Sequence, residues 1–315
     1  MTAPTGSPTD SSSDSLSDSD DADLTAAEIA WDLTTLLDGR TTEDLLDAAD
    51  AVVTEIEAYR GRIATLDAAG LAGLMHKVAE LQDLQGRVGY HSMLRLSENT
   101  LDPAGGAEMM RVQERLTPMA TRLVFVELEW AETDDDHAEA VLADPVLDFC
   151  AHHLRGIRKY RPHLLSEPVE QALTEKSVSG AGAWVRLFDE LTSSVEVRLP
   201  GTPDDAPVSL EKGLSLLQDP DRSVRKAAAA AVTEGLAPGL RTRAYVFNTL
   251  LLDKRVDDDL RTYPTWISSR NLDNEASDES VEALVAAVQG RYDLPQRWYG
   301  LKAKVLGLDR LAAYD

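Results

Sequence analysis

Histidine and cysteine supply the side chains of this chain best suited to metal binding or nucleophilic catalysis. A helix that binds zinc and activates water carries H-E-x-x-H, in which two histidines share one helical face and the glutamate acts on the water. None of the six histidines is followed by Glu and then by a second His four positions on. The sequence therefore contains no helix of this type. The six are His76, His91, His137, His152, His153 and His163.

The densest group of these residues is Cys150, His152 and His153. Adjacent residues of a helix point about 100° apart, so the two histidines are poorly placed to share one metal. Cys150 and His153 stand three positions apart, and on a helix they could pair as nucleophile and base. Cys150 also follows Val146 and Phe149 in an apolar stretch, which is typical of a buried structural cysteine. We favour the structural interpretation and keep the Cys–His pair as the alternative.

Two acidic runs and one glycine-containing stretch complete the candidates for ligand binding. Asp134–Asp136 lacks the alternating spacing and turn glycine of a calcium loop, and Asp257–Asp259 is interpreted as the end or the solvated face of a helix. The stretch GAGAW at 180–184 lacks the lysine and the preceding strand of a phosphate-binding loop. These patterns predict no catalytic residue and no metal ligand, and they leave the substrate-binding residues unknown.

Helical periodicity dominates the chain from Leu24 onward. Three apolar stripes, with most steps of three or four residues, predict long helices that pack as an antiparallel bundle. Thr41 and Asp44 stand in capping-box positions before the first stripe. Pro118 lies inside the third and is expected to kink or split its helix. The stripes are Leu46, Ala49, Val53, Ile56 and Ile63; Leu74, Val78, Leu81 and Val88; and Val112, Leu116, Met119, Leu123, Val126 and Trp130.

The hydrophobic period changes near residue 195. Apolar residues alternate from Val195 to Leu199, a turn follows, and the chain returns through Val208 and Leu210, which predicts one short β-hairpin near 195–210. Helical patterns then resume. We therefore expect a mainly α fold in three parts. These are a disordered Ser/Asp-rich tail at 1–23, a multi-helix N-terminal domain at 24–194 and a second helical region at 195–315.

The charge balance limits the partners of the chain. Asp and Glu number 55 against 31 Lys and Arg, a formal net charge of −24. Such a surface repels phosphate backbones and anionic lipids, so nucleic-acid and membrane binding are disfavoured. The single cysteine fits a reducing compartment, and no apolar run approaches the roughly 20 residues of a bilayer span. We expect a cytoplasmic protein.

Five short strings, in this order and at these separations, resemble the oligoendopeptidase F family, zinc metallopeptidases that are related to thimet oligopeptidase and cut short peptides. The most telling is R-P-H-x-L-S-E-x-x-E, here Arg161 to Glu170, in which Arg161 could pair with Glu167 or Glu170. The resemblance runs from about residue 28 to the last residue. The strings are FVELEW (125–130), IRKYRPHLLSEPVEQAL (157–173), LQDPDRSVRKAA (217–228), RTYPTWISSRNL (261–272) and WYGLKAKVLGLDRLAAYD (298–315).

The resemblance implies the N-terminal portion of a zinc-dependent metalloendopeptidase, with 195–315 as the helical beginning of its catalytic domain. In that family the zinc helix, a third glutamate ligand and a tyrosine and histidine that stabilise the transition state follow the string that ends this chain. We therefore expect the chain to be truncated before the zinc motif, to bind no zinc and to cleave no peptide alone.

The same resemblance implies short peptides as ligands and zinc as the cofactor of full-length relatives. Exposed apolar surface is expected where a missing half would dock, so the chain is expected to associate with that catalytic half or with a second copy. The alternative is a non-catalytic, all-helical module that binds peptides or proteins and has lost the chemistry.

Overall fold

The computed structural model describes residues 31–100, 102–200 and 206–315, so the tail expected at 1–23 lies outside the described residues. The mainly α fold is confirmed, and the described residues contain a single two-stranded sheet. None of the described helices combines the length and hydropathy that a membrane span needs. Short 3-10 turns occur at Leu33–Leu37, Ile63–Thr65, Pro145–Leu147, Arg161–His163 and Leu216–Gln218.

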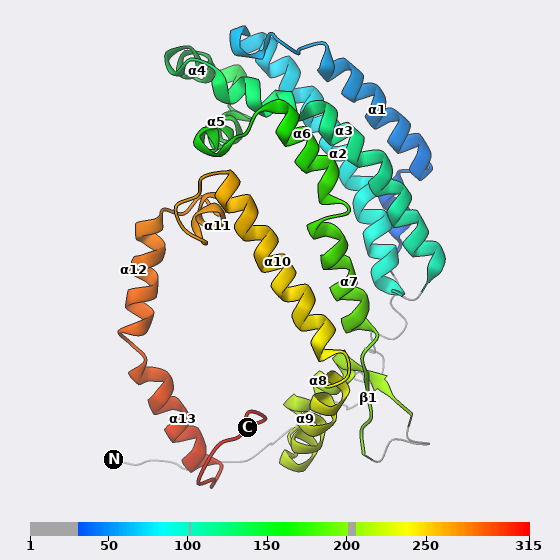
Figure 1. Ribbon diagram of the computed structural model, residues 1–315, viewed down its shortest axis with the longest axis vertical. Coiled ribbons are helices and arrows are strands. Elements are labelled where there is room, and N and C mark those ends of the chain that lie inside the picture. The colour runs from blue at the N-terminus through cyan, green and yellow to red at the C-terminus, as the bar shows by residue number, and fades with distance from the viewer. Residues whose placement is uncertain (1–30, 101, 201–205) are drawn as a thin grey trace, which may run out of the picture.

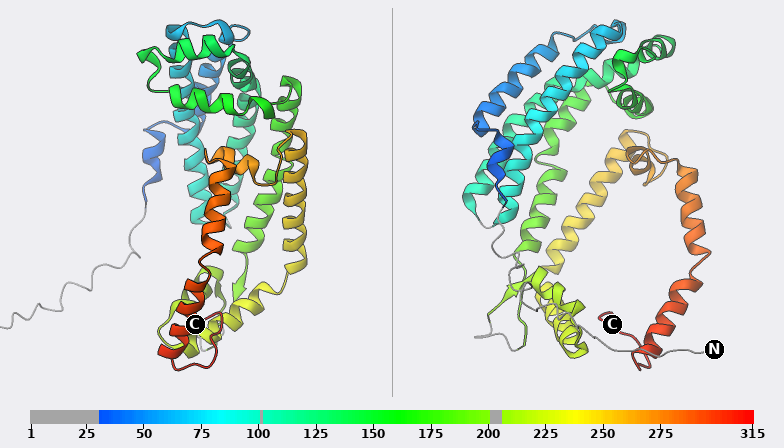
Figure 2. Two further views of the ribbon diagram at one scale, coloured as in Figure 1. Left: turned by 90° about the vertical axis from the view of Figure 1, so that its left-hand side faces the viewer. Right: turned by 180° about the vertical axis from the view of Figure 1, so that it is seen from behind.

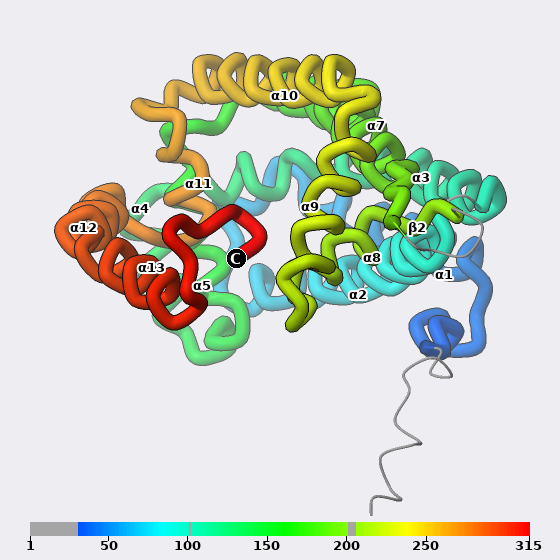
Figure 3. Tube along the Cα trace, turned by 90° about the horizontal axis from the view of Figure 1, so that it is seen from below, coloured from blue at the N-terminus to red at the C-terminus, as the bar shows by residue number. Residues whose placement is uncertain are grey.

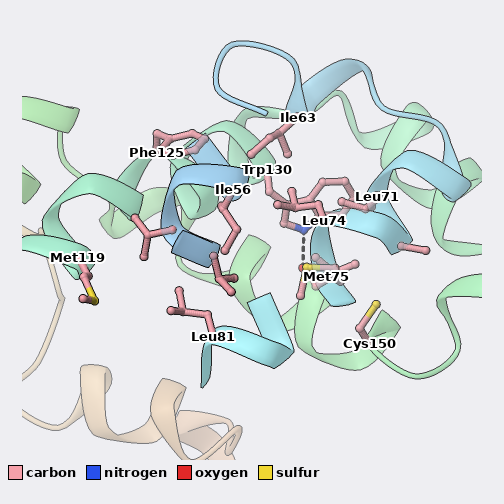
Figure 4. Packing of buried hydrophobic residues seen from close by; sticks show 14 of the residues in the cluster. Ile56, Ile63, Leu71, Leu74, Met75, Leu81, Met119, Phe125, Trp130 and Cys150 are labelled. Carbon is pink, nitrogen blue, oxygen red and sulfur yellow. Dashed lines mark hydrogen bonds between the residues drawn. The ribbon is translucent and has the colours of Figure 1, made fainter. Parts of the chain in front are cut away.

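Three long helices form the N-terminal bundle: α1 (Thr42–Glu57), α2 (Ala68–Glu98) and α3 (Pro103–Glu132). The predicted capping box is confirmed, because Thr41 accepts from the Asp44 N–H at 3.1 Å and Asp44 accepts from the Thr41 N–H at 2.9 Å. The three apolar stripes meet in one core, part of which Figure 4 shows around Ile56, Leu74 and Trp130. The bundle is therefore held by the residues that the periodicity identified.

Of the two outcomes expected at Pro118, a kink or a split, the structure excludes the split, because α3 is continuous from Pro103 to Glu132. A proline inside a helix removes one backbone hydrogen bond and costs about 3 kcal/mol. Met119 and Phe125, which follow it, are almost fully buried in the bundle core. Burial of such side chains contributes about 2 kcal/mol each, which offsets the cost and keeps the helix intact.

Four shorter helices continue the chain from the bundle: α4 (Asp135–Leu142), α5 (Ala151–Lys159), α6 (Glu167–Ser177) and α7 (Ala181–Ser193). The indole N–H of Trp130 in α3 donates to the Leu154 carbonyl in α5 at 2.8 Å, and both residues are buried. Helix α6 packs on α3, and α7 leads away from the bundle (Figure 1).

The hairpin expected near 195–210 is confirmed as β1 (Glu196–Val197) and β2 (Val208–Ser209), which pair antiparallel with Val197 opposite Val208. The strands cover α8 (Leu210–Ser215) and α9 (Arg222–Leu236), and Val197 forms a second small core with Ala231 and Val232. A Cβ at Gly235 would lie 2.6 Å from the Glu196 carbonyl oxygen, so glycine permits this close approach. The domain boundary expected near 195 stays a prediction.

We refer to the last helices, α9 to α13, as the helical frame. Helix α10 (Leu240–Leu260) runs beside α7, and α11 (Ser268–Asp273), α12 (Asp278–Gln289) and α13 (Asp293–Val305) follow (Figure 1 and Figure 2). Seen from below in Figure 3, α12 and α13 stand apart from α10 before the chain turns back toward α9. None of the residues of α12 and α13 is buried. These two helices therefore draw little of their stability from packing within the described chain.

We expect matched leucine substitutions to separate the two regions. Leu46→Ala in α1 removes a side chain with 0% exposure and should lower the free energy of unfolding by about 3 kcal/mol. Leu284→Ala in α12 removes one with 64% exposure and should change it by less than about 0.5 kcal/mol. Urea unfolding of the two variants measures this difference, and equal losses would contradict the burial described above.

Candidate functional site

A cavity of about 790 Å³ lies where α3, α5 and α6 face α10 and α11. It is the strongest candidate site because it gathers titratable and aromatic side chains from five helices. Acidic side chains outnumber basic ones on its walls. The charged and aromatic lining residues are Glu127, His152, His153, Tyr160, His163, Glu170, Lys254, Asp257, Asp258, Arg261, Tyr263, Asp273 and Glu275.

The cavity walls are joined by a two-bond ion pair between Arg261 and Glu170. The guanidinium donates to both carboxylate oxygens, at 2.7 and 2.9 Å, and Glu170 also accepts the Leu165 N–H at 2.9 Å. Burial opposes the charge of Glu170, but the hydrogen bonds from Arg261 and Leu165 outweigh it and hold the pKa of the carboxyl below its usual range. The pKa of Arg261 is raised by the same pair. Both groups are therefore charged across the physiological range.

Aromatic side chains extend this junction. The rings of His163 and Tyr263 stack with centroids 3.9 Å apart, and His163 Nδ1 lies 2.9 Å from the Arg261 carbonyl oxygen. The Tyr160 hydroxyl donates to Asp273 at 2.7 Å. Burial, followed by the hydrogen bond to Asp273, raises the pKa of Tyr160, so its hydroxyl stays protonated and acts as a donor. These contacts fix the end of α10 and α11 against the segment between α5 and α6.

Cys150 differs in burial from the two histidines that follow it, because His152 and His153 are exposed. Cys150 is buried at the start of α5, and burial raises the pKa of its thiol, which opposes formation of a nucleophilic thiolate. His152 lies 2.8 Å from Glu275 at the cavity rim, and Phe149 stacks on His76 with centroids 4.4 Å apart. The structural interpretation of Cys150 is thus the one that its surroundings support.

The two acidic runs are engaged in structure. Asp134 caps α4, and Asp135 binds Arg158 and Arg161, which lowers its pKa. In the second run, Asp257 binds Arg261 at 3.1 Å and Asp258 binds Lys254 at 2.6 Å. Among the described residues, no three His, Cys, Asp or Glu side chains gather as a metal-binding group.

The pairing expected within the string at 161–170 is wrong. Arg161 donates to the Ala131 and Thr133 carbonyls and to Asp135, whereas Glu167 binds Arg60. Glu170 binds Arg261, which is 91 positions away. The residues of the cavity were therefore not predicted from the sequence. The available signal was that both partners lie in strings of the same resemblance, but a single sequence does not say which strings touch.

This site makes no nucleophile–base pair and no metal-ligand set from the residues described. Its geometry can hold two helical regions together and present charged and aromatic groups to a ligand. The prediction that the chain contains no catalytic residue and no metal ligand stays a prediction, as does the identity of substrate-binding residues.

We expect Glu170→Gln to lower the free energy of unfolding at pH 7 by about 2 kcal/mol, because it removes the carboxylate that binds Arg261 through two hydrogen bonds and leaves Arg261 only Asp257 as a charged partner. The pKa of Glu170 is lower in the folded chain, so the unfolded chain binds more protons between the two values. The stabilisation is full above the ordinary glutamate pKa of about 4.3 and is lost as the pH falls below it.

Denaturation at a series of pH values between 7 and 3 measures this effect. Glu139→Gln is the matched control, because Glu139 meets Arg155 only at 3.5 Å on the surface and should change stability by less than about 0.5 kcal/mol. Parallel pH profiles for Glu170→Gln and the wild-type chain would rule out the contribution of the pair.

The sequence of the chain is similar to those of oligopeptidases. The family model described as oligopeptidase F matches residues 129–196. Group B oligopeptidase PepB of Streptococcus agalactiae serotype III (strain NEM316) is 25% identical over 309 residues, which cover 94% of this chain and 50% of PepB. Oligopeptidase PepF of Bacillus subtilis (strain 168) is 22% identical over 273 residues, which cover 85% of this chain and 40% of PepF.

Two solved structures share the fold. Oligoendopeptidase-F from Enterococcus faecium superposes with a TM-score of 0.75 at 18% identity, covering 87% of this chain and 55% of that one. A putative peptidase from Chlamydophila abortus gives a TM-score of 0.58 at 16% identity, covering 91% and 50%. At these identities the likeness shows the fold alone. The chain spans about half the length, or less, of the curated relatives that it matches.

Proposed function

We propose a function from the similarity of this chain to oligopeptidase F proteins, which its five sequence strings predicted. The chain would supply the helical, non-catalytic portion of a zinc-dependent metalloendopeptidase that hydrolyses short peptides. It would be inactive by itself. The cytoplasmic location, and the absence of nucleic-acid and membrane partners, stay predictions from composition.

The observation that carries the proposal is the similarity over 94% of this chain and only 50% of PepB. The relatives thus contain about as much chain again as the part that this protein matches. Zinc chemistry would belong to that other part. Among the described residues the donor groups do not fit a zinc site, since five of the six cavity carboxylates are bound by Arg261, Lys254, Tyr160 or His152 and no three donor side chains gather as a metal-binding group. No chemical step is assigned to its residues.

The exposed faces of α12 and α13 support a partner of this kind. Trp298 is 58% exposed and Val305 is 76% exposed, although large apolar side chains gain about 2 kcal/mol from burial. We refer to six such residues as the α12–α13 apolar face. They are Leu284, Val285, Val288, Trp298, Leu301 and Val305. We propose that this face packs against the polypeptide that corresponds to the unmatched part of the relatives, with a second copy of the chain as the alternative occupant.

A non-catalytic binding module is the second candidate function. The cavity favours this second function, because its walls are formed entirely by residues of this chain and are joined by the Arg261–Glu170 ion pair. In that case the chain would bind short peptides directly, without zinc and without hydrolysis.

We expect the purified chain to hold less than stoichiometric zinc and to leave an internally quenched peptide intact. Elemental analysis and fluorescence give the two readouts, and wild-type Bacillus subtilis PepF serves as the positive control for cleavage. One tightly held zinc per chain, or cleavage above a blank, would overturn the proposal. Saturable binding of the peptide to the isolated chain would favour the binding module instead.

The docking part of the proposal has its own test. The chain is mixed with a polypeptide comprising the PepF residues that it does not match, and complex formation is followed by sedimentation. Leu284→Glu and Trp298→Glu should each weaken the complex at least tenfold, because each places a charge in the α12–α13 apolar face. The exposed substitution Arg255→Glu on α10 is the control. Unchanged binding by both face variants, with an intact complex, would exclude this face as the docking surface.

A further inference from the structure

The N-terminus of α9 carries two arginines on one face. Asp221 caps the helix, and Arg222 and Arg225 follow with the three-residue spacing that brings side chains together. Arg225 is oriented by its own loop, since its guanidinium donates to the Asp219 carbonyl at 2.9 Å and to the Pro220 carbonyl at 3.0 Å. The guanidinium of Arg225 is therefore oriented in part by carbonyl groups of its own loop.

The distant residue is Asp315. Arg222 donates to its carboxylate through two parallel bonds, Nε to Oδ1 at 2.8 Å and a terminal nitrogen to Oδ2 at 3.0 Å. Arg225 lies 3.5 Å from Oδ1, and the Ala312 N–H donates to Oδ2 at 2.8 Å. The carboxylate side chain is 0% exposed. The planar guanidinium of arginine suits this two-bond pairing with a carboxylate, whereas the ammonium of lysine does not provide it.

Tyr314 adds two contacts to the same place. The Arg225 Nε donates to the Tyr314 carbonyl at 2.7 Å, and the Arg222 guanidinium lies 5.2 Å from the centroid of the Tyr314 ring. Hydrogen bonds from Arg222 and from the Ala312 N–H lower the pKa of Asp315 to about 2, so the carboxylate is charged at neutral pH. Arg222 and Arg225 together therefore contact the backbone and ring of Tyr314 and the carboxylate of Asp315.

This contact joins two parts of the fold that otherwise share little packing. Helices α12 and α13 bury no residue, and their upstream end is attached through α11 to α10. Downstream, the chain from Leu306 to Asp315 returns to α9, which itself precedes α10. The elements from α9 to Asp315 therefore close on themselves, as Figure 1 and Figure 3 show.

We propose that Arg222 and Arg225 are positioning residues that anchor the segment after α13 on the start of α9, and so fix α12 and α13 relative to α10. We call this set, Arg222, Arg225, Tyr314 and Asp315, the α9 clasp. The clasp replaces the apolar packing that α12 and α13 lack. The clasp requires no peptidase activity, so this inference is independent of the proposed function.

Hydrogen–deuterium exchange of the full chain tests the clasp. In the wild type, amides of 293–315 should exchange at least tenfold more slowly than an unstructured peptide. The double variant Arg222→Ala/Arg225→Ala should remove most of that protection and leave amides of α1 to α3 unchanged. Arg255→Ala is the matched control, because Arg255 meets Asp259 only at 3.8 Å on the exposed side of α10. Equal exchange in the double variant and the wild type, or unprotected 293–315 in the wild type, overturns the proposal.

Conservative substitutions separate this recognition from general charge. Arg222→Lys keeps the charge but loses the fork, and Asp315→Asn keeps the shape but loses the charge, so each should lose at least threefold of the protection. The same measurements on a chain with a Gly-Ser extension after Asp315 isolate the side-chain carboxylate from the terminal one. Arg222→Ala and Asp315→Ala should be non-additive when combined, because each removes the same bonds. Additive effects would mean that the two residues act separately, and the clasp would be rejected.

Discussion

The ion pair between Arg261 and Glu170 is the contact on which the arrangement of the chain depends. It joins residue 261, just beyond the end of α10, to α6, and α6 in turn packs on the N-terminal bundle. Two parallel charge-assisted hydrogen bonds in a mostly buried place fix orientation as well as distance. The stacked His163–Tyr263 pair and the Tyr160–Asp273 bond lie beside it and depend on the same approach. Without this junction, α10 and the helices after it would be tied to the bundle mainly through α7.

A second arginine–carboxylate junction lies at the opposite end of the same helical frame. There Arg222 holds Asp315, again with two bonds and across 93 positions of sequence. At both of these junctions a two-bond arginine–carboxylate pair joins segments that are far apart in the sequence. The N-terminal bundle contains such a pair as well, between Arg122 and Glu57, but adds a continuous apolar core from Leu45 to Leu154. Apolar packing therefore contributes much more to the order of the bundle than to the order of α12 and α13, which bury no residue.

The sequence predicts the first kind of order far better than the second. Stripes such as Leu46 to Ile63 specify a buried face because helical period is a local property, and the capping box at Thr41 and the hairpin at Val197 are local for the same reason. The cavity depends on which cation meets which anion across about a hundred residues. Arg161 illustrates this limit of sequence-based prediction, since two glutamates lie near it in the sequence but it binds Asp135 in the fold. Pro118 shows another, because burial of its neighbours overrides a local helix breaker.

The burial of Cys150 has a practical consequence for spectroscopy. It is the chain's single thiol, it lies within the bundle core, and burial raises its pKa. An accessible thiolate attacks maleimide and thiol-reactive nitroxide reagents, so a buried thiol with a raised pKa should react slowly at neutral pH. A cysteine engineered on an exposed helix would then take the probe selectively in the native background. The protein is therefore suited to site-directed labelling without removal of its native cysteine. Pairs of engineered cysteines would allow distances across the helical frame to be measured.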